Sequence, residues 1–355
     1  MLSICYSIMA KKYIKNEQLG FFDIHKTLEK VSNMGDILVR LNQVIDWSIF
    51  TPVLQQLPRE TAKGPGGRPA YREEFLFRIL VLQKLHNLSD QQTQFQILDR
   101  HSFKRFLGLC EADQVPDQNT IWLFREKLIK AELLEKLFQT FYAHLEKNGM
   151  ILNDGQIVDA TIIEVPRQRN KPLHNEEIKN GQTPLEWKEN QAKLRQKDTD
   201  ARWTKKRNTN YYGYKNHIVV DAGSKLIKRC KVTSAEVHDK RVLEELLEEN
   251  DPPTYADSAY GDKECQEVYE RKNIKPQINE RGYRNKPLSK KQNKANRKKS
   301  KVRSRVEHPF AQIKCCMKNG IQRYIGIIRN EASILFTNLV YNIVRSEQLW
   351  RMKKA

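Results

Sequence analysis

Cysteine clusters are missing from this chain of 355 residues. Six cysteines stand at positions 5, 110, 230, 265, 315 and 316, and no two of them have the C-x-x-C spacing. Structural zinc and a disulfide framework are therefore not expected, and this use of cysteine is compatible with a protein of the reducing cytosol. No apolar run approaches about 18 residues, and the N-terminus has no basic region before its short apolar stretch. We expect a cytoplasmic protein with no membrane partner.

A phosphate-binding loop is also missing. The glycine-rich segment GPGGRP at 64–69 lacks the Lys-Ser/Thr pair of such a loop, so we interpret it as a hinge and do not expect nucleotide binding. At the N-terminus, Met9 is followed by AKKYIKNEQ, and it is an alternative start to Met1.

Negative charge is scarce. The chain has 63 Lys and Arg against 43 Asp and Glu, a net charge of +20, which predicts a polyanionic partner. Residues 281–305 contain twelve basic residues and no acidic one. Such a segment is predicted to be mobile until it meets phosphate, and it would deliver DNA to the acidic residue that follows it. A solubilising or nuclear-localisation segment is the alternative.

The sequence pattern changes near residue 150. Before it, apolar residues recur with helical spacing over 72–88, 89–109 and 117–147, with a possible capping box at Ser89 and Gln92. These helices predict an all-α domain over 1–150 for DNA binding or dimerisation. A helix-turn-helix that reads DNA and a simple helical bundle are both compatible with this pattern.

Strands dominate after residue 150. Runs at 156–165 and 211–222 are rich in β-branched and aromatic residues and are predicted strands. Residues 225–237 and 253–260 are two further predicted strands, and 274–278 is a short one. Residues 238–250 and 263–273 are predicted to form helices. This order predicts an α/β domain over 151–355, with a mixed sheet flanked by helices.

Three acidic residues stand in contexts that suit metal-binding carboxylates. Asp159 interrupts the apolar run QIVDATIIEV and Asp257 follows PTYA, where an unpaired charge is costly. We expect these two side by side on neighbouring strands, and Glu307 on a helix that crosses the same edge. Three carboxylates can hold two Mg²⁺ ions about 3.5–4 Å apart for phosphoryl transfer. A structural ion pair is the alternative reading.

Two cations accompany Glu307 at helical spacing. Arg303, Glu307 and Lys314 are separated by four and seven residues, which predicts one shared helical face that combines a metal ligand with phosphate contacts. An ordinary Arg303–Glu307 salt bridge is the alternative. Pro309 requires that the helix begin close to Glu307 or bend there.

Several ordered motifs resemble one known family. VDATIIEV, DTDARWTKKRNTNYYGYKNHIVVD, VHDKRVLEELL, YADSAYGDKE and VRSRVEHPFAQIK are together similar to the bacterial DDE-type insertion-sequence transposases, specifically insertion sequence family five. The likeness covers nearly the whole chain from about residue 20. It implies a ribonuclease H-like catalytic domain whose acidic triad falls on Asp159, Asp257 and Glu307. A location at the bacterial nucleoid follows from this resemblance.

The resemblance also implies DNA-binding residues. The Tyr-Arg-Glu-Lys signature of such transposases is matched by Arg303, Glu307 and Lys314, while Ser300 replaces its tyrosine. The family's insertion between the first two strands corresponds to about 167–210. Expected phosphate contacts are Arg202, Lys205, Lys206, Arg207, Lys298 and Lys299, in addition to Arg303 and Lys314. Trp187 and Trp203 are available either for base stacking or for packing.

The implied reaction is metal-dependent DNA transposition. Two Mg²⁺ ions, or Mn²⁺ in their place, would support cleavage at the terminal inverted repeats and attack of the 3′-hydroxyl on double-stranded target DNA. Paired ends imply a homodimer. Two alternatives stay open: a ribonuclease H-like endonuclease that cuts without joining, and an inactive DNA-binding derivative.

Overall fold

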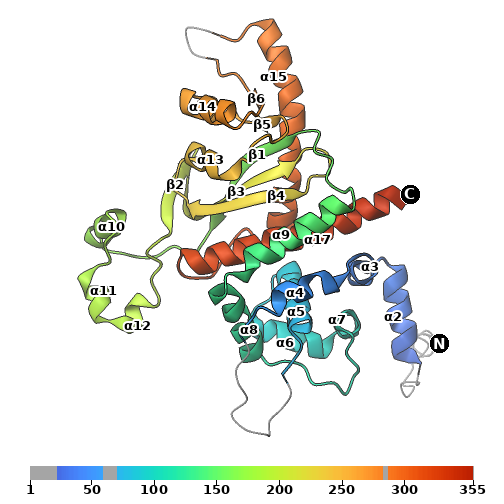
Figure 1. Cartoon of the computed structure of the whole chain (residues 1–355). Helices are drawn as coiled ribbons and strands as arrows, with labels where there is room; N and C mark the ends of the chain where they lie inside the picture. Colours follow the sequence, from blue (N-terminus) through green and yellow to red (C-terminus); the bar gives the residue numbers. More distant parts are fainter. Residues whose placement is uncertain (1–21, 59–69, 283–286, 355) are drawn as a thin grey trace, which may run out of the picture.

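The chain forms a helical half and an α/β half that meet along one long helix (Figure 1). The computed structural model describes residues 22–58, 70–282 and 287–354. The predicted hinge at 64–69 and the alternative start at Met9 lie outside these ranges. None of the described helices has the length and apolarity needed to cross a membrane.

The first half is helical, as predicted. Ser89 caps α6 by accepting the backbone N–H of Gln92, and Asp117 caps α8 in the same way. The predicted helix over 117–147 is wrong in its continuity, because Glu132 has a positive φ of 53° and separates two helices. The helices are α2 (Asp23–Asn33), α3 (Ile37–Val44), α4 (Thr51–Leu54), α5 (Glu73–His86), α6 (Asp90–Asp99), α7 (His101–Leu107), α8 (Gln118–Lys130) and α9 (Leu133–Lys147).

A mixed sheet forms the centre of the second half. The order β2-β3-β1-β5-β6 runs across it, and β4 pairs with the same edge of β3 as β2 does, further along the strand. β3 is antiparallel to β1, whereas β1, β5 and β6 are parallel. The strands are β1 (Gln156–Glu164), β2 (Arg202–Lys206), β3 (Thr209–Asp221), β4 (Ile227–Ser234), β5 (Thr254–Ala256) and β6 (Pro276–Ile278). The α/β fold with a mixed sheet is confirmed, and it is compatible with a ribonuclease H-like domain.

Glycine is required where β3 changes partner from β2 to β4. Gly213 has φ +150°, and a Cβ there would lie 2.3 Å from the carbonyl oxygen of Ile163. A side chain would therefore push β3 away from β1. The glycine keeps both strands in register up to the pair Glu164–Gly213.

Helices cover both faces of the sheet. On one face lie α13 (Leu243–Leu246) and α14 (Lys263–Arg271), whose buried residues pack with Val158 and Val219. The predicted helix over 238–250 is largely wrong. Only a 3₁₀ turn at Asp239–Val242 and the short α13 form, because Asp251 accepts the N–H of Glu248 and fixes the following turn.

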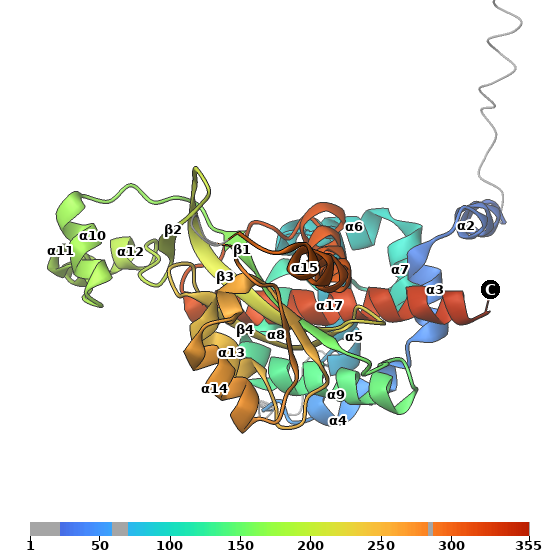
Figure 2. The ribbon, with the colours of Figure 1, turned by 90° about the horizontal axis from the view of Figure 1, so that it is seen from above.

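The other face is covered by α17 (Ile327–Lys354), which crosses the whole molecule (Figure 2). It packs against β4 and also against α3, α5, α8 and α9 of the first half. One hydrophobic cluster consequently joins residues such as Phe77 and Phe141 to Ile157 of the sheet through Val340. The two halves share a core.

Polar side chains on the buried side of α17 bond to the sheet. Asn342 donates to the carbonyl of Ile227 and accepts its N–H, at 2.8 and 2.9 Å. Asn338 and Asn216 bond to each other through their amides. Arg345 donates to the carbonyl of Ser224. These bonds satisfy groups that would be costly to bury alone.

The region between β1 and β2 forms a small helical module. It contains α10 (Pro172–Lys179), α11 (Leu185–Glu189) and α12 (Gln191–Leu194), and it extends from one end of the sheet (Figure 1). Asp198 ties it to β3, because both carboxylate oxygens accept the hydroxyl of Tyr214 at 2.8 Å. Asp200 accepts the N–H of Ile327 at the start of α17.

The basic segment 281–305 is ordered over most of its length, so the prediction that it is mobile is wrong for the described part. It forms α15 (Lys290–Arg303), which begins with a capping box between Ser289 and Gln292. Asn279 donates to the hydroxyl of Ser300, and Lys299 donates to the carbonyl of Ile278. These contacts along β6 and the residue after it compensate for the charge repulsion within the helix.

Candidate active site

The first two acidic residues lie on adjacent parallel strands. The register pairs Ile157 of β1 with Tyr255 of β5, so two residues further on Asp159 comes opposite Asp257. Asp159 is within β1, and its carboxylate accepts the N–H of Ala160. Asp257 directly follows β5 and accepts the N–H of Ala259, which begins a 3₁₀ turn. The predicted strand over 253–260 is therefore shorter than expected and ends just before the carboxylate.

Glu307 comes from a separate helix after the basic segment. It is the first residue of α16 (Glu307–Ala311), and its side chain is exposed while Val306 and Phe310 anchor the turn in the core. Pro309 sits in the first turn of this helix, where its missing N–H breaks no helical bond. The helix thus begins at Glu307, which is one of the two outcomes that the proline allowed.

The expected common α-helical face of Arg303, Glu307 and Lys314 is wrong. Arg303 ends α15, residues Ser304–Val306 form a 3₁₀ turn, and Lys314 lies in a π-helical turn at Gln312–Cys316. The spacing argument assumed a uniform helix of 3.6 residues per turn. The changes of pitch give each residue its own direction, and Arg303 turns towards β1, where its Nη1 lies 3.5 Å from Oδ2 of Asp159.

The three carboxylates act on one another electrostatically. Burial raises the pKa of Asp159 to about 6, and the charges of Asp257 and Glu307 add to this rise. The N–H of Ala160 and the guanidinium of Arg303 oppose it without cancelling it. Burial is the main cause of the raised pKa, and a carboxyl whose pKa is raised by burial and by neighbouring carboxylates is a common property of functional sites.

The donor groups at this site suit a hard divalent cation. Carboxylate oxygens are the ligands that Mg²⁺ prefers in proteins. As the side chains lie, no group of three or more His, Cys, Asp or Glu residues in the described ranges is close enough to hold a metal ion. The long, exposed side chain of Glu307 is the one that can move towards the two aspartates by rotation about its own bonds.

Lys314 faces a cavity beside the acidic residues. The cavity has a volume of about 590 Å³, and its charged lining residues are Lys206, Arg207, Lys314 and Glu164, the last of these from the same strand as Asp159. Burial and the charge of Lys206 lower the pKa of Lys314, while Glu164 and Glu307 raise it. Lys206 and Arg207 stand at the tip of the β2–β3 hairpin, with Arg207 in the left-handed region at φ 56°.

Other predicted DNA contacts differ in how free their side chains are. Lys205 and Lys298 are exposed, whereas the ammonium of Lys299 is bound to a carbonyl. Arg202 donates to the carbonyls of Thr199, Ala201 and Ile178, and its Nε lies 3.4 Å from Glu236. Its guanidinium is thus used to hold the insertion module against the sheet.

The two tryptophans have different roles. Trp187 is fully buried under Lys197 and beside His174, so of the two roles left open for it, base stacking and packing, the structure shows packing. The cause is that α10–α12 fold around it as their small core. Trp203 is 49% exposed, with Arg167 over its ring and Tyr212 at 5.1 Å, so it is the accessible one.

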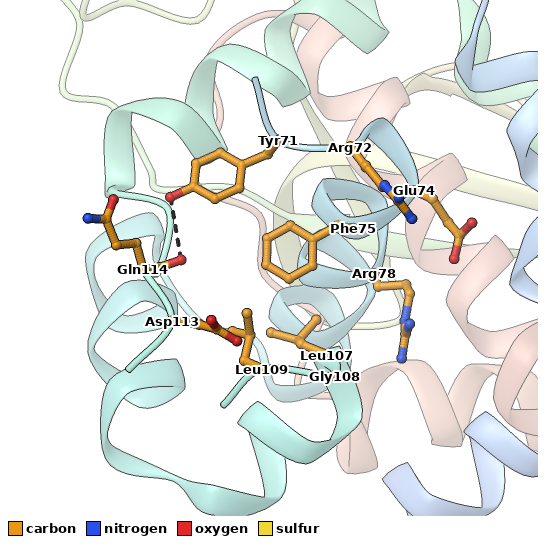
Figure 3. Close-up of a pocket in the computed structure, with 10 residues that line it drawn as sticks. All are labelled: Tyr71, Arg72, Glu74, Phe75, Arg78, Leu107, Gly108, Leu109, Asp113 and Gln114. Atoms are coloured by element: carbon orange, nitrogen blue, oxygen red, sulfur yellow. Dashed lines mark hydrogen bonds between the residues drawn. The ribbon is translucent and has the colours of Figure 1, made fainter. Parts of the chain in front are cut away.

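Sequence reasoning did not indicate any cavity in the helical half. Figure 3 shows one of about 450 Å³, in which the rings of Tyr71 and Phe75 stand between Arg78 and the turn at Gln114. The hydroxyl of Tyr71 donates to the carbonyl of Gln114. This cavity is lined by α5, the end of α7 and the turn that follows, and it contributes nothing to the acidic site.

Comparison with known proteins assigns both halves of the chain. Residues 26–127 match the family described as Transposase domain (DUF772). Residues 152–343, which are more than half of the chain and include all three acidic residues, match the family described as Transposase DDE domain. No solved structure matches the chain. The chain belongs to the transposases that carry a DDE domain.

Proposed function

We propose that this transposase binds the terminal inverted repeats of its insertion sequence, cleaves the DNA ends and joins the 3′-hydroxyls to target DNA. The observation that carries the proposal is the electrostatic coupling of three acidic residues. The charges of Asp257, after β5, and of Glu307, at the start of α16, both raise the pKa of Asp159 in β1. They lie within the segment that matches the DDE domain. The sequence motifs favour an insertion sequence of family five as the element that encodes this transposase.

Asp159, Asp257 and Glu307 would hold two Mg²⁺ ions, with Mn²⁺ as a substitute. Bound there, the ions supply Lewis-acid stabilisation of the attacking and leaving oxygens of a phosphodiester. The protein's own part is to bring the three carboxylates together and to hold Asp159 in place through the Ala160 N–H and Arg303. The raised pKa of Asp159, caused by burial and increased by the charges of Asp257 and Glu307, supports this assignment.

Basic side chains around the acidic residues would position the DNA. Arg303 and Lys314 flank the carboxylates, and Lys206 and Arg207 extend the same positive surface to the hairpin tip. Lys205 and Lys298 are exposed phosphate contacts, and Lys299 is a weaker candidate because a carbonyl holds it. Arg202 is left out, since both terminal nitrogens of its guanidinium already donate to carbonyls of the protein. Such contacts fix the register of the DNA and carry no sequence information directly.

Recognition of the terminal repeats would fall to the helical half and to the module at 167–201. Transposition needs two ends at once, so the working unit is a homodimer on DNA. The shared core keeps the helical half at a fixed position relative to the acidic site.

The test is an assay of purified protein with a labelled duplex that carries the element's own ends, together with a target plasmid, in Mg²⁺ or Mn²⁺. Cleavage and joined products are expected with either metal, and neither with EDTA. Cleavage without joined products would replace this proposal by a nuclease, and binding without metal-dependent chemistry would indicate an inactive DNA-binding protein.

The acidic site should bind Mg²⁺ more weakly at acid pH, so cleavage should need a higher Mg²⁺ concentration. The pKa of Asp159 is about 6, so below that value its protonated carboxyl binds metal poorly. At limiting Mg²⁺ we expect the half-saturating concentration to rise about tenfold for each pH unit below 6. Rates of cleavage measured against Mg²⁺ concentration at several pH values test this. A loss of rate that added Mg²⁺ does not restore would contradict the prediction.

A further inference from the structure

A second cleft opens where the two halves of the chain meet. One wall is formed by residues 83–90, at the end of α5 and the start of α6, and the opposite wall by Lys314 and residues 318–324. Its volume is about 540 Å³. Pockets of about 300–1,000 Å³ take ligands of nucleotide size. The cleft is therefore large enough for one unit of a nucleic-acid strand.

Hydrogen bonds hold its two walls together. The amide of Asn87 donates to the carbonyl of Lys318 at 3.0 Å, and the amide of Asn319 donates to the carbonyl of Lys84 at 2.9 Å. Both bonds link α5 to a segment more than 200 residues away in the sequence. Because the backbone on each side is fixed, the side chains of the cleft are arranged before any ligand arrives.

Positive charge dominates the lining. The cations are Lys84, Arg125, Lys314, Lys318 and Arg323, and the one carboxylate among the lining residues is Asp90. Asp90 is already paired with Arg125, through two bonds of 2.6 and 2.8 Å. Among the residues that the structure describes, no carboxylate pairs with any of the other four cations. The cleft lacks the negative charge that would balance it.

The ammonium of Lys84 has no acidic partner among the described residues of the cleft. Its ammonium donates to the hydroxyl of Ser333 at 2.6 Å, which is a neutral partner. Burial and the nearby charge of Arg125 lower the pKa of Lys84 to about 7. The Lys84 side chain is half-buried, so its charged form is poorly hydrated, and an anionic ligand would stabilise that form.

The same residues argue for a phosphate as the ligand, in preference to a base. The aromatic ring in the cleft belongs to Tyr324, and the charged groups of Lys84 and Arg125 lie 5.8 and 5.5 Å from its centroid. These cation–π contacts occupy the ring of Tyr324, so the ring is not available for base stacking. Ammonium and guanidinium groups are instead strong phosphate ligands.

The cleft continues into the hairpin cavity beside the acidic site. Lys314, Gly320 and Ile321 line both. A Cβ at Gly320 would come within 3.3 Å of Cγ of Lys314, so the glycine leaves room for this lysine between the two cavities. Cations from Arg207 to Lys84 thus follow one path, from the hairpin past Lys314 to the helical half.

We propose that this path binds the phosphates of a DNA strand on its way from the acidic site to the helical half, with Lys84, Lys318 and Arg323 as contacts in the inter-domain cleft. The inference rests on the proposed function for the identity of the DNA. It adds a binding site built by both halves of the chain.

The experiment measures DNA binding in EDTA as a function of salt. The variant carries Lys318→Gln and Arg323→Gln at two exposed positions. Residue 318 has a left-handed backbone with φ of 54°, and glutamine is no more strained in that conformation than lysine is. The matched control, Lys130→Gln with Lys147→Gln, removes the same charge from exposed positions outside both cavities. Thermal melting checks that all three proteins fold.

The expected result is a shallower salt dependence in the cleft variant alone. Each lost contact lowers the slope of log K against log salt by about 0.9 for duplex DNA and about 0.7 for a single strand. The variant should therefore lose about 1.8 on a duplex probe or about 1.4 on a single-stranded probe. The probe on which this loss occurs identifies the form of DNA that the cleft holds. Affinity should fall on the order of tenfold at low salt.

An unchanged slope, or equal losses in the variant and the control, would overturn the cleft assignment while leaving the proposed function intact. Failure of the wild-type protein to bind DNA would overturn both. Because the measurement needs no metal, failure of cleavage in Mg²⁺ would contradict the proposed function and would not alter the result for the cleft.

Discussion

Replacing Asp159 by Asn should abolish cleavage and yet make the metal-free protein more stable. The substitution removes a proposed metal ligand, so we expect the rate to fall by at least about 10³-fold, with DNA binding retained. It also removes a buried charge whose pKa is raised from 3.8 to about 6. Since one pKa unit corresponds to about 1.4 kcal/mol, ionised Asp159 costs the fold up to about 3 kcal/mol.

The destabilisation by ionised Asp159 depends on pH, and the direction of its pKa shift sets this dependence. The pKa in the folded protein lies above the unfolded value, so the penalty is absent below pH about 4, grows as the pH rises through 6 and is complete at pH about 8. Melting curves without metal should therefore separate the variant from the wild type by several degrees at pH 8 and converge at low pH. Added Mg²⁺ should stabilise the wild type and narrow the difference.

Asp154→Asn is the matched control, because Asp154 is exposed and lies just before β1. It should change neither the rate nor the melting temperature. If Asp159→Asn instead lowered the stability at pH 8, the bonds to Ala160 and Arg303 would outweigh the desolvation of the carboxylate. The conclusion that burial of ionised Asp159 destabilises the fold would then be wrong.

Asn342→Ala should have the largest effect on stability. Asn342 bonds both backbone groups of Ile227 within the core, and alanine would leave a buried donor and a buried acceptor without partners. Each unsatisfied group costs about 1–3 kcal/mol, so we expect a loss of about 2–5 kcal/mol in the free energy of unfolding. Urea denaturation at neutral pH measures it.

Arg351→Ala provides the comparison on the same helix. Arg351 is 60% exposed and its pair with Glu347 is 3.9 Å long, so its removal should cost less than about 0.5 kcal/mol. Equal losses for both substitutions would show that α17 is weakened by any change, and that the bonds of Asn342 to β4 have no special role.

The strands and two of the acidic residues were predictable because their signals are local. Apolar runs predicted the positions of β1, β3 and β4, and Asp159 and Asp257 stood out as charges within or just after such runs. Parallel pairing of β1 with β5 then brings them together. Their roles, and that of Glu307, stay predictions until the substitutions are made.

The features that local patterns could not give depend on long-range contacts or on changes in helical pitch. α17 is buried on most sides and uses asparagines as internal partners, so its sequence shows no simple amphipathic stripe. α15 looks unfoldable by composition and is held by β6 and its flanking residues. The inter-domain cleft exists because Asn87 and Asn319 join segments distant in the sequence. Lys314 could be placed only once its π-helical turn was known.

The position of α17 at the very end of the chain bears on how copies of the element lose their activity. A reading frame that stops before Ile327 still encodes the acidic residues and most of the basic ones, but it lacks the helix against which both halves bury their apolar surfaces. Such a product should be cleared by proteases as an unfolded chain. Late truncations should therefore remove the protein altogether and should not leave a shorter folded form.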